Sequence, residues 1–276
     1  MALRKVLLGN VLVLILKKYS YWLCFLLLSS FYNHSLASFQ SALVLEPQLS
    51  LFDYQETDRQ GESLNTEGGQ LLGGRLALQL ELNNFLTELS AQQLSGQVAY
   101  QGKTQTGSQH STNTYNKIFR GELGFGYRFH LPVQIEPRIS LQYYSWYRAI
   151  RAKNSVSNLT EEYRGKVLKP SVRLYLAQNY IELGLTRTFN NSMKIQATHC
   201  LSSVTVYPKA ETAWFVRGYK QLFENRNYSS FISLSIDQYR MKESDVESGQ
   251  TCFGPVGWSE PDNWMRLIQL GLGFRF

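Results

Sequence analysis

Residues 264–276, which end this 276-residue chain, alternate strictly between two kinds of side chain. Every second position is apolar, at Ile268, Leu270, Leu272, Phe274 and Phe276. The positions between them hold glutamine, glycine and arginine. Because successive side chains of a β-strand point to opposite faces, this pattern predicts a strand with one continuously apolar face and one small or polar face.

A strand of this kind that ends in an aromatic residue at the final carboxylate resembles the closing strand of bacterial outer-membrane β-barrel proteins. In that family, the last strand with its terminal phenylalanine is the signal that the insertion machinery reads. The resemblance implies that the barrel insertion machinery is a partner during assembly. It also implies an assembly signal formed by Leu270, Leu272, Phe274 and Phe276.

The first 42 residues differ sharply from the rest, because they contain no acidic residue and hold two apolar runs, 6–16 and 21–32. Each run is too short to cross a bilayer as a helix, which needs about 20 residues. Basic residues, an apolar run and the small residues of Ser35-Leu36-Ala37 predict a cleaved secretory signal over residues 1–37, with Ala42 as a second candidate cleavage site. The alternative is an inner-membrane anchor that stays attached.

The formal net charge of +7 falls when the predicted signal is removed. Four basic residues leave with it, so 24 of the 28 remain against 21 acidic residues, a balance of about +3. Nucleic-acid ligands need a concentrated basic face, so no nucleic-acid partner is predicted. Basic residues outside the membrane can instead meet the phosphates of outer-membrane lipid and lipopolysaccharide.

Beyond residue 42 no apolar run approaches helical spanning length, which excludes a helical membrane protein. A barrel is compatible with this mild hydropathy, because each strand shows lipid only half of its side chains. Alternation predicts ten strands: 43–54, 75–82, 85–100, 119–129, 135–148, 171–176, 181–185, 213–223, 232–237 and 264–276. Within 85–100 the triplet Ala91-Gln92-Gln93 breaks the alternation, as a bulge would, and leaves the facing of this strand unassigned.

Five polar segments alternate with short turns and are predicted to be long loops: 56–70, 101–117, 149–162, 189–212 and 240–263. An even number of antiparallel strands with this alternation is typical of outer-membrane barrels, whose closure removes the sheet edges. We therefore predict an all-β fold in residues 43–276, an antiparallel up-and-down transmembrane β-barrel of ten strands, within a range of eight to twelve. The predicted location is the outer membrane of a Gram-negative bacterium, with both termini in the periplasm.

A soluble β-sandwich or lipocalin-like barrel is disfavoured by the charged face of the strands, which a dry core could not hold. Ten strands enclose a narrow lumen. We expect the inward charges to pair across this lumen and plug it, whereas a narrow outer-membrane pore is the alternative. The predicted lumen charge network consists of Arg75, Glu81, Arg120, Glu122, Arg128, Glu136, Arg138, Arg173, Glu182 and Asp237.

Spacings typical of outer-membrane enzymes are absent from the sequence. The ten-stranded omptin proteases use Asp-x-Asp and Asp-x-His pairs, and no aspartate here forms such a pair with His110, His130 or His199. The His-x-Ser pair of barrel phospholipases and deacylases is also absent from a lipid-facing strand. His199 adjoins Cys200, but no second ligand follows at metal-site spacing. No catalytic residue, metal ligand or cofactor is therefore predicted.

Cys200 and Cys252 are the only cysteines beyond the predicted signal, and they fall in the fourth and fifth predicted loops. In an oxidising compartment they predict a disulfide. Two separate thiols are the alternative, which alkylation without reductant would reveal. For the whole chain we predict a non-enzymatic outer-membrane surface protein whose extracellular loops contact a partner, a host surface or lipopolysaccharide. A narrow pore and, less favoured, a membrane hydrolase with its site at the rim are the alternatives.

Overall fold

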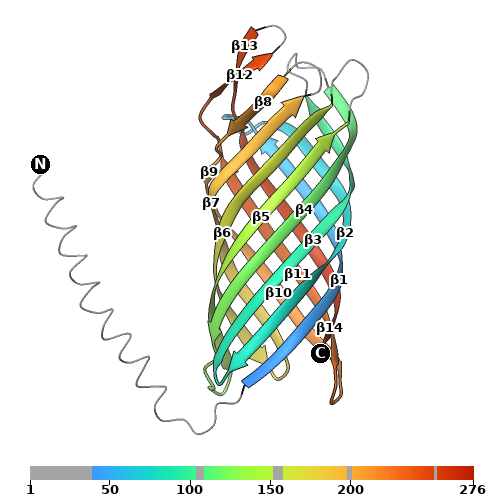
Figure 1. The fold of residues 1–276 in the computed structure, drawn as a ribbon, viewed down its shortest axis with the longest axis vertical. Coiled ribbons are helices and arrows are strands. Elements are labelled where there is room, and N and C mark those ends of the chain that lie inside the picture. Colours follow the sequence, from blue (N-terminus) through green and yellow to red (C-terminus); the bar gives the residue numbers. More distant parts are fainter. Residues whose placement is uncertain (1–38, 104–108, 152–157, 198–200, 252–253) are drawn as a thin grey trace, which may run out of the picture. The chain divides into compact units, whose positions relative to one another are not determined.

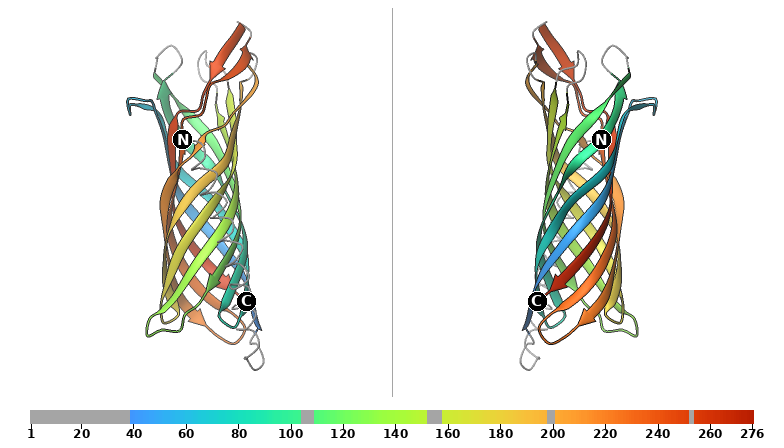
Figure 2. Two further views of the ribbon diagram at one scale, coloured as in Figure 1. Left: turned by 90° about the vertical axis from the view of Figure 1, so that its left-hand side faces the viewer. Right: turned by 90° about the vertical axis from the view of Figure 1, so that its right-hand side faces the viewer.

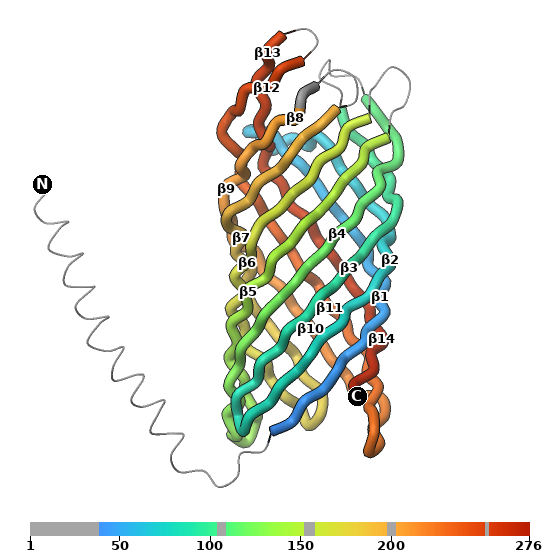
Figure 3. Tube along the Cα trace, in the orientation of Figure 1, coloured from blue at the N-terminus to red at the C-terminus, as the bar shows by residue number. Residues whose placement is uncertain are grey.

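The computed structural model describes residues 39–103, 109–151, 158–197, 201–251 and 254–276, which form β-strands, turns and short connections (Figures 1 and 3). The predicted signal over residues 1–37 lies outside this part of the chain. Ten strands form the wall: β1 (Phe39–Thr57), β2 (Ser63–Leu82), β3 (Phe85–Lys103), β4 (Gln109–Tyr127), β5 (Gln134–Ile150), β6 (Leu159–Leu176), β7 (Asn179–Ala197), β10 (Thr212–Glu224), β11 (Ser229–Lys242) and β14 (Asp262–Arg275). Four shorter strands accompany them: β8 (Leu201–Val206), β9 (Lys209–Ala210), β12 (Glu247–Thr251) and β13 (Gly254–Trp258). Among the described residues, no helix has the length and hydropathy needed to cross a membrane.

The wall closes on itself with antiparallel pairing throughout. Strand β7 pairs with β10, β10 with β11, and β11 with β14. The first and last strands then meet, and at their ends Leu43 and Phe276 exchange two backbone hydrogen bonds of 3.0 and 2.9 Å. Figure 2 shows the closed wall from two sides. The predicted fold class, a closed antiparallel barrel of ten strands, is confirmed.

The two ends of the barrel differ. At the lower end of Figure 1, which also holds the C-terminus, adjacent strands are joined by tight turns such as Asn83–Asn84 and Ala177–Gln178. Asn83 has a φ of 55°, a left-handed conformation that asparagine tolerates better than most residues. At the upper end, β12 and β13 form a hairpin that stands above the wall (Figure 1).

The extent predicted for the long loops is wrong. The first connection shrinks from 56–70 to the five residues between Thr57 and Ser63, and the wall strands likewise enter the other four predicted loops. Strands β1 to β4 reach 19 or 20 residues. A membrane-spanning strand needs only about 9–11 residues. About half of each of these strands therefore extends beyond the thickness of a bilayer.

An apolar belt covers the outer surface of the lower half of the barrel. On β1 it runs over the nine positions from Leu43 to Leu51, close to the length that a tilted spanning strand needs. We define the belt by these exposed side chains: Leu43, Leu45, Leu49, Leu51, Leu72, Leu76, Leu78, Leu82, Phe85, Leu89, Phe119, Leu123, Phe125, Ile139, Leu141, Tyr143, Leu168, Val172, Leu176, Ile181, Leu183, Leu185, Trp214, Leu222, Ile232, Leu234, Leu270, Leu272 and Phe276. We take the segments that carry these residues as membrane-spanning, because an outward apolar band is the lipid-facing part of a transmembrane barrel.

Above the belt the pattern inverts, so that apolar side chains face the lumen and polar ones face outward. On β3 the exposed Leu89 belongs to the belt, whereas Leu94, five residues further up, is fully buried inside. The intervening triplet 91–93 is not a bulge, because its pairing with β4 is continuous. The triplet instead marks the point at which apolar side chains change from the outer to the inner face of the strand. A bulge occurs instead on β7 between Phe189 and Ser192, beside Asn190, whose φ is 52°.

Candidate functional site

The lower half of the lumen contains all ten residues of the predicted charge network, and each of them forms an ion pair, either with another member or with a further lumen residue. Arg120 and Asp237 approach to 3.2 Å across the barrel, from β4 to β11. Near the lower end, Glu136 is fully buried and pairs with three arginines: Arg138 on β5, Arg173 on β6 and Arg128, just beyond the end of β4. The remaining pairs of this region are Arg128–Glu81 at 2.8 Å, Arg173–Glu182 at 3.0 Å and Arg138–Glu182 at 3.8 Å.

Four members of this network are not predicted by the sequence pattern. Arg75 is held between Glu46 at 3.2 Å and Glu88 at 2.5 Å, and Lys169 lies 3.0 Å from Glu122. Arg217 on β10 lines the same region. Strict alternation through β1 places Glu46 inside. The sequence leaves the facing of the predicted strands 85–100 and 213–223 open, and Lys169 precedes the sixth predicted strand, 171–176. With these four included, the network holds seven cations and seven carboxylates: Arg75, Arg120, Arg128, Arg138, Lys169, Arg173 and Arg217, and Glu46, Glu81, Glu88, Glu122, Glu136, Glu182 and Asp237.

Little free space remains between these side chains. The middle of the lumen has a cavity of about 30 Å³, lined by Arg75, Arg120, Lys169 and Arg217 among other polar residues. This volume suits one or two water molecules. Glycine makes room for the network at Gly126, where an added Cβ would lie 2.8 Å from a carboxylate oxygen of Glu136.

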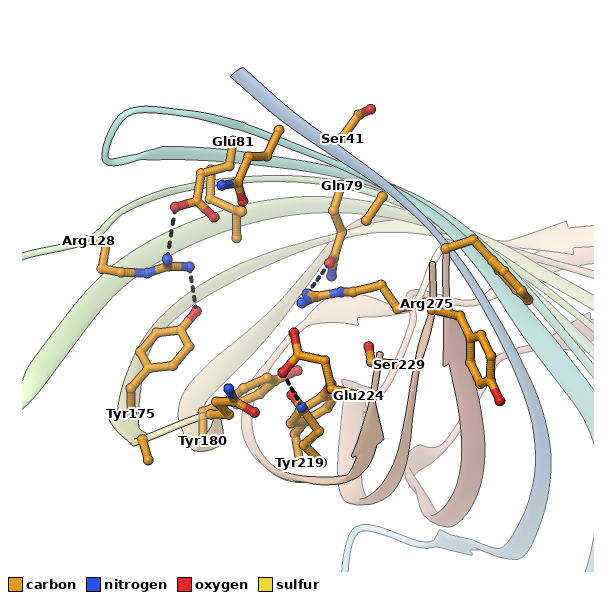
Figure 4. A pocket seen from close by; sticks show the side chains of 18 of the residues that line it. Ser41, Gln79, Glu81, Arg128, Tyr175, Tyr180, Tyr219, Glu224, Ser229 and Arg275 are labelled. Atoms are coloured by element: carbon orange, nitrogen blue, oxygen red, sulfur yellow. Dashed lines mark hydrogen bonds and ion pairs between the residues drawn. The ribbon is translucent and has the colours of Figure 1, made fainter. Parts of the chain in front are cut away.

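Below the network, the lumen widens into a vestibule of about 640 Å³ at the lower end (Figure 4). Arg128 bridges Glu81 and the hydroxyl of Tyr175 on one side of it. On the other side, the rings of Tyr180 and Tyr219 stack at 4.9 Å between centroids. The vestibule is polar, and the charge network closes its inner end.

Above the network, the lumen is filled by an apolar core. Its fully buried members include Leu71, Leu94, Trp146 and Leu267, which come from four different strands. The indole of Trp146 stacks on Tyr163 at 4.6 Å, and its nitrogen donates to Asn116 at 2.7 Å. This part of the barrel is packed like the interior of a soluble protein.

Arg148 forms a second polar cluster on top of this core. Its side chain is fully buried and donates hydrogen bonds to three glutamates that come from β1, β2 and β6. Those to Glu56 and Glu67 measure 3.0 and 2.6 Å, and the third acceptor is Glu161. Glu260 completes the cluster, because it accepts a 2.9 Å hydrogen bond from Tyr163. The Arg148 cluster thus sets one cation among four carboxyl groups.

The Arg148 cluster lies outside the membrane-spanning segments, since the outward side chains of β6 and β7 at its level are Glu162, Arg164 and Lys194. Burial is the main reason that the pKa of Glu161 rises to about 7, against the opposing effect of Arg148. Burial likewise raises the pKa of Glu260 well above its usual range. Protonation of these two carboxyls lowers the negative charge that the cluster must hold. The alternation does not predict this cluster, because all four of its glutamates fall within the predicted long loops.

The remaining sequence-predicted residues are the disulfide candidates, the assembly-signal residues and the histidines. The disulfide candidates Cys200 and Cys252 lie outside the described residues. The assembly-signal residues sit at the lower end of β14, where Leu270, Leu272 and Phe276 are exposed on the outer surface and Phe274 is half-buried.

The described residues assemble no group of three or more histidine, cysteine or acidic side chains suited to a metal ion. His130 contacts Asn84 at 3.0 Å, and His110 lies beside the ring of Tyr100. In this part of the chain neither histidine contacts an aspartate.

No protein-family model matches the sequence, and no curated protein matches it. Among solved structures, the outer membrane protease OmpT from Escherichia coli superposes with a TM-score of 0.53 at 8% identity, covering 88% of this chain and 99% of OmpT. The fold is that of bacterial outer-membrane β-barrel proteins. The toluene transporter TodX from Pseudomonas putida (TM-score 0.37, 7% identity, 85% and 89% of the two chains) and the outer membrane protein AlkL (0.40, 12%, 89% and 95%) are also similar.

Proposed function

We propose that this protein is a non-enzymatic outer-membrane barrel with a sealed lumen, which acts as a scaffold for its extracellular end. The observation that carries the proposal is the filling of the lumen in three successive layers: the charge network, the apolar core and the Arg148 cluster. A solute entering from the vestibule meets a cavity of about 30 Å³ and then closely packed aromatic rings. Such an interior favours a scaffold over a diffusion pore.

The polarity of the barrel supports an orientation with both termini in the periplasm. Outer-membrane barrels have short periplasmic turns and longer extracellular parts. Here the tight turns and the C-terminus share the lower end, and the hairpin β12–β13 stands at the other end. In this orientation the polar-walled upper half projects from the cell surface.

The upper end is the surface proposed to contact a partner or a host surface. It exposes large apolar side chains above the belt, including Tyr207 and Val246, which are 60% and 65% exposed. Exposed apolar side chains of this size would gain free energy by burial against a partner. The neighbouring Arg59 and Glu243 form a 2.8 Å ion pair that ties the β1–β2 turn to the segment after β11.

Two experiments test this proposal. An epitope tag inserted at Gln60 should be detected by antibody on intact cells, whereas the same tag at Arg226 should be detected only after permeabilisation. Liposomes containing the refolded protein should swell in iso-osmotic arabinose no faster than empty liposomes. Swelling at a rate proportional to protein content would contradict the sealed lumen, and reversed tag exposure would contradict the orientation.

A further inference from the structure

A group of cations lies on the outer surface of β6 and β7, immediately above the apolar belt. Lys166 is ten positions above Leu176, at the lower end of β6, and Arg187 is eight positions above the start of β7. Leu168 pairs directly with Arg187, so Lys166 is its diagonal neighbour, about 7–8 Å away. Arg164 is the next outward residue on β6. We call Arg164, Lys166 and Arg187 the basic patch.

The protein itself neutralises little of this charge. Arg164 pairs with Glu162 at 2.5 Å, but Lys166 has no ion pair or hydrogen bond within the described residues. In the described part of the chain, Arg187 donates only to the hydroxyl of Thr212, at 3.1 Å. Across the barrel, in contrast, Arg266 pairs with Asp53 at 2.5 Å, so the outward cation there has its own carboxylate.

The surroundings of the basic patch match the boundary of a lipid leaflet. Below it, the exposed Leu141, Leu168 and Leu185 offer an apolar surface for acyl chains. Level with it, Tyr143 lies directly opposite Lys166, and its ring is exposed on the outer surface. Aromatic residues gather at such interfaces in transmembrane barrels. An amphipathic ligand with an acyl body and an anionic head fits this arrangement better than a free anion does.

We propose that the basic patch binds the phosphate groups of lipid A, the glycolipid anchor of lipopolysaccharide, at the upper edge of the belt. The assignment to the outer leaflet rests on the orientation proposed above, whereas the chemistry of the site does not. Lysine and arginine side chains near a membrane surface attract anionic headgroups, and each contributes measurably to binding. The guanidinium group of Arg187, whose protein partner is only the Thr212 hydroxyl, can also hold a phosphate through paired hydrogen bonds.

The test uses the full refolded barrel in zwitterionic detergent micelles, titrated with bisphosphorylated lipid A and followed by calorimetry. The Lys166→Glu/Arg187→Glu variant should bind at least about tenfold more weakly than the unaltered protein. Lys220→Glu is the matched control, because Lys220 is also exposed and outward-facing but lies near the lower end of β10. This control should bind normally. All three proteins must show the folded, unheated gel mobility.

Two further ligands identify what is bound. Dephosphorylated lipid A should bind the unaltered protein about as weakly as bisphosphorylated lipid A binds the double variant, and inorganic phosphate should not compete at millimolar concentration. Equal affinity of the double variant and the unaltered protein would overturn the proposal, as would an equal loss in Lys220→Glu or effective competition by phosphate. Binding in micelles does not depend on the orientation of the barrel in the membrane. A reversed pattern of epitope-tag exposure on cells would therefore contradict the proposed orientation without changing the lipid A binding result.

Discussion

Replacing Arg148 with methionine should destabilise the barrel strongly, and more so at alkaline pH. The substitution keeps much of the apolar stem but removes the cation that contacts Glu56, Glu67 and Glu161 in a fully buried site. Breaking a buried ion pair by removing one partner costs about 3–5 kcal/mol, because the other charge stays buried without compensation. We expect a loss of this size in the free energy of unfolding at pH 8. At pH 5.5 the loss should be about half as large, since carboxyls without the arginine then take up protons.

The assay is urea unfolding of the protein in phospholipid vesicles, followed by tryptophan fluorescence and by the gel mobility of unheated samples at both pH values. Arg164→Met is the matched control, because it removes an exposed arginine that pairs with Glu162 at the same end of the barrel. Solvent screens an exposed ion pair, so the control should change the stability little. A loss below 1 kcal/mol for Arg148→Met at pH 8, or an equal loss at both pH values, would refute the role assigned to the Arg148 cluster.

Three further predictions follow. The pKa of Glu161 is about 7 in the folded protein and near 4.5 when unfolded, so its contribution to stability is full at low pH and is lost as pH rises between these values. Glu161→Gln should remove up to about 3 kcal/mol of this pH dependence. Urea unfolding at pH 5 and pH 8 measures it. Gly184→Ala should lower the free energy of unfolding by about 1–3 kcal/mol because its Cβ would overlap the ring of Phe215, whereas Gly218→Ala, whose nearest contact is 3.9 Å away, should be nearly neutral. Deletion of Phe276 removes two backbone hydrogen bonds that close the barrel and should reduce severalfold the fraction of cellular protein with folded gel mobility.

The fold is predictable from the sequence where a strand keeps its apolar side chains on the outer face and its polar side chains on the inner face. Within the belt, lipid outside and paired charges inside produce clean alternation, as in residues 75–82 and 264–276, and this alternation gave the strand number and the ten charged lumen residues. The two-residue alternation of side chains along a strand is enough to predict that Arg120 and Asp237 face the lumen. Their exact partners did not follow, because a side chain that faces the lumen can reach several strands.

The upper half was not predictable by the same rule, because its faces exchange character. On β3 the outward apolar side chain is Leu89 and the inward one is Leu94, so the alternation breaks between them even though the strand is continuous. Polar outward residues then resemble loop sequence. All four glutamates of the Arg148 cluster consequently fall within the predicted loops, so the alternation does not predict the cluster. A search for apolar alternation that resumes in the opposite phase would have revealed the strand extensions.

The most direct test of the sealed lumen is single-channel recording of the refolded protein in a planar bilayer with 1 M KCl. Insertion is first verified by gel mobility before and after heating, and a general diffusion porin added afterwards shows that the same bilayer can report conductance. A sealed barrel predicts no discrete current steps up to 150 mV. Reproducible steps of one size, dependent on protein concentration, would contradict the sealed lumen and would make the charge network the lining of a pore.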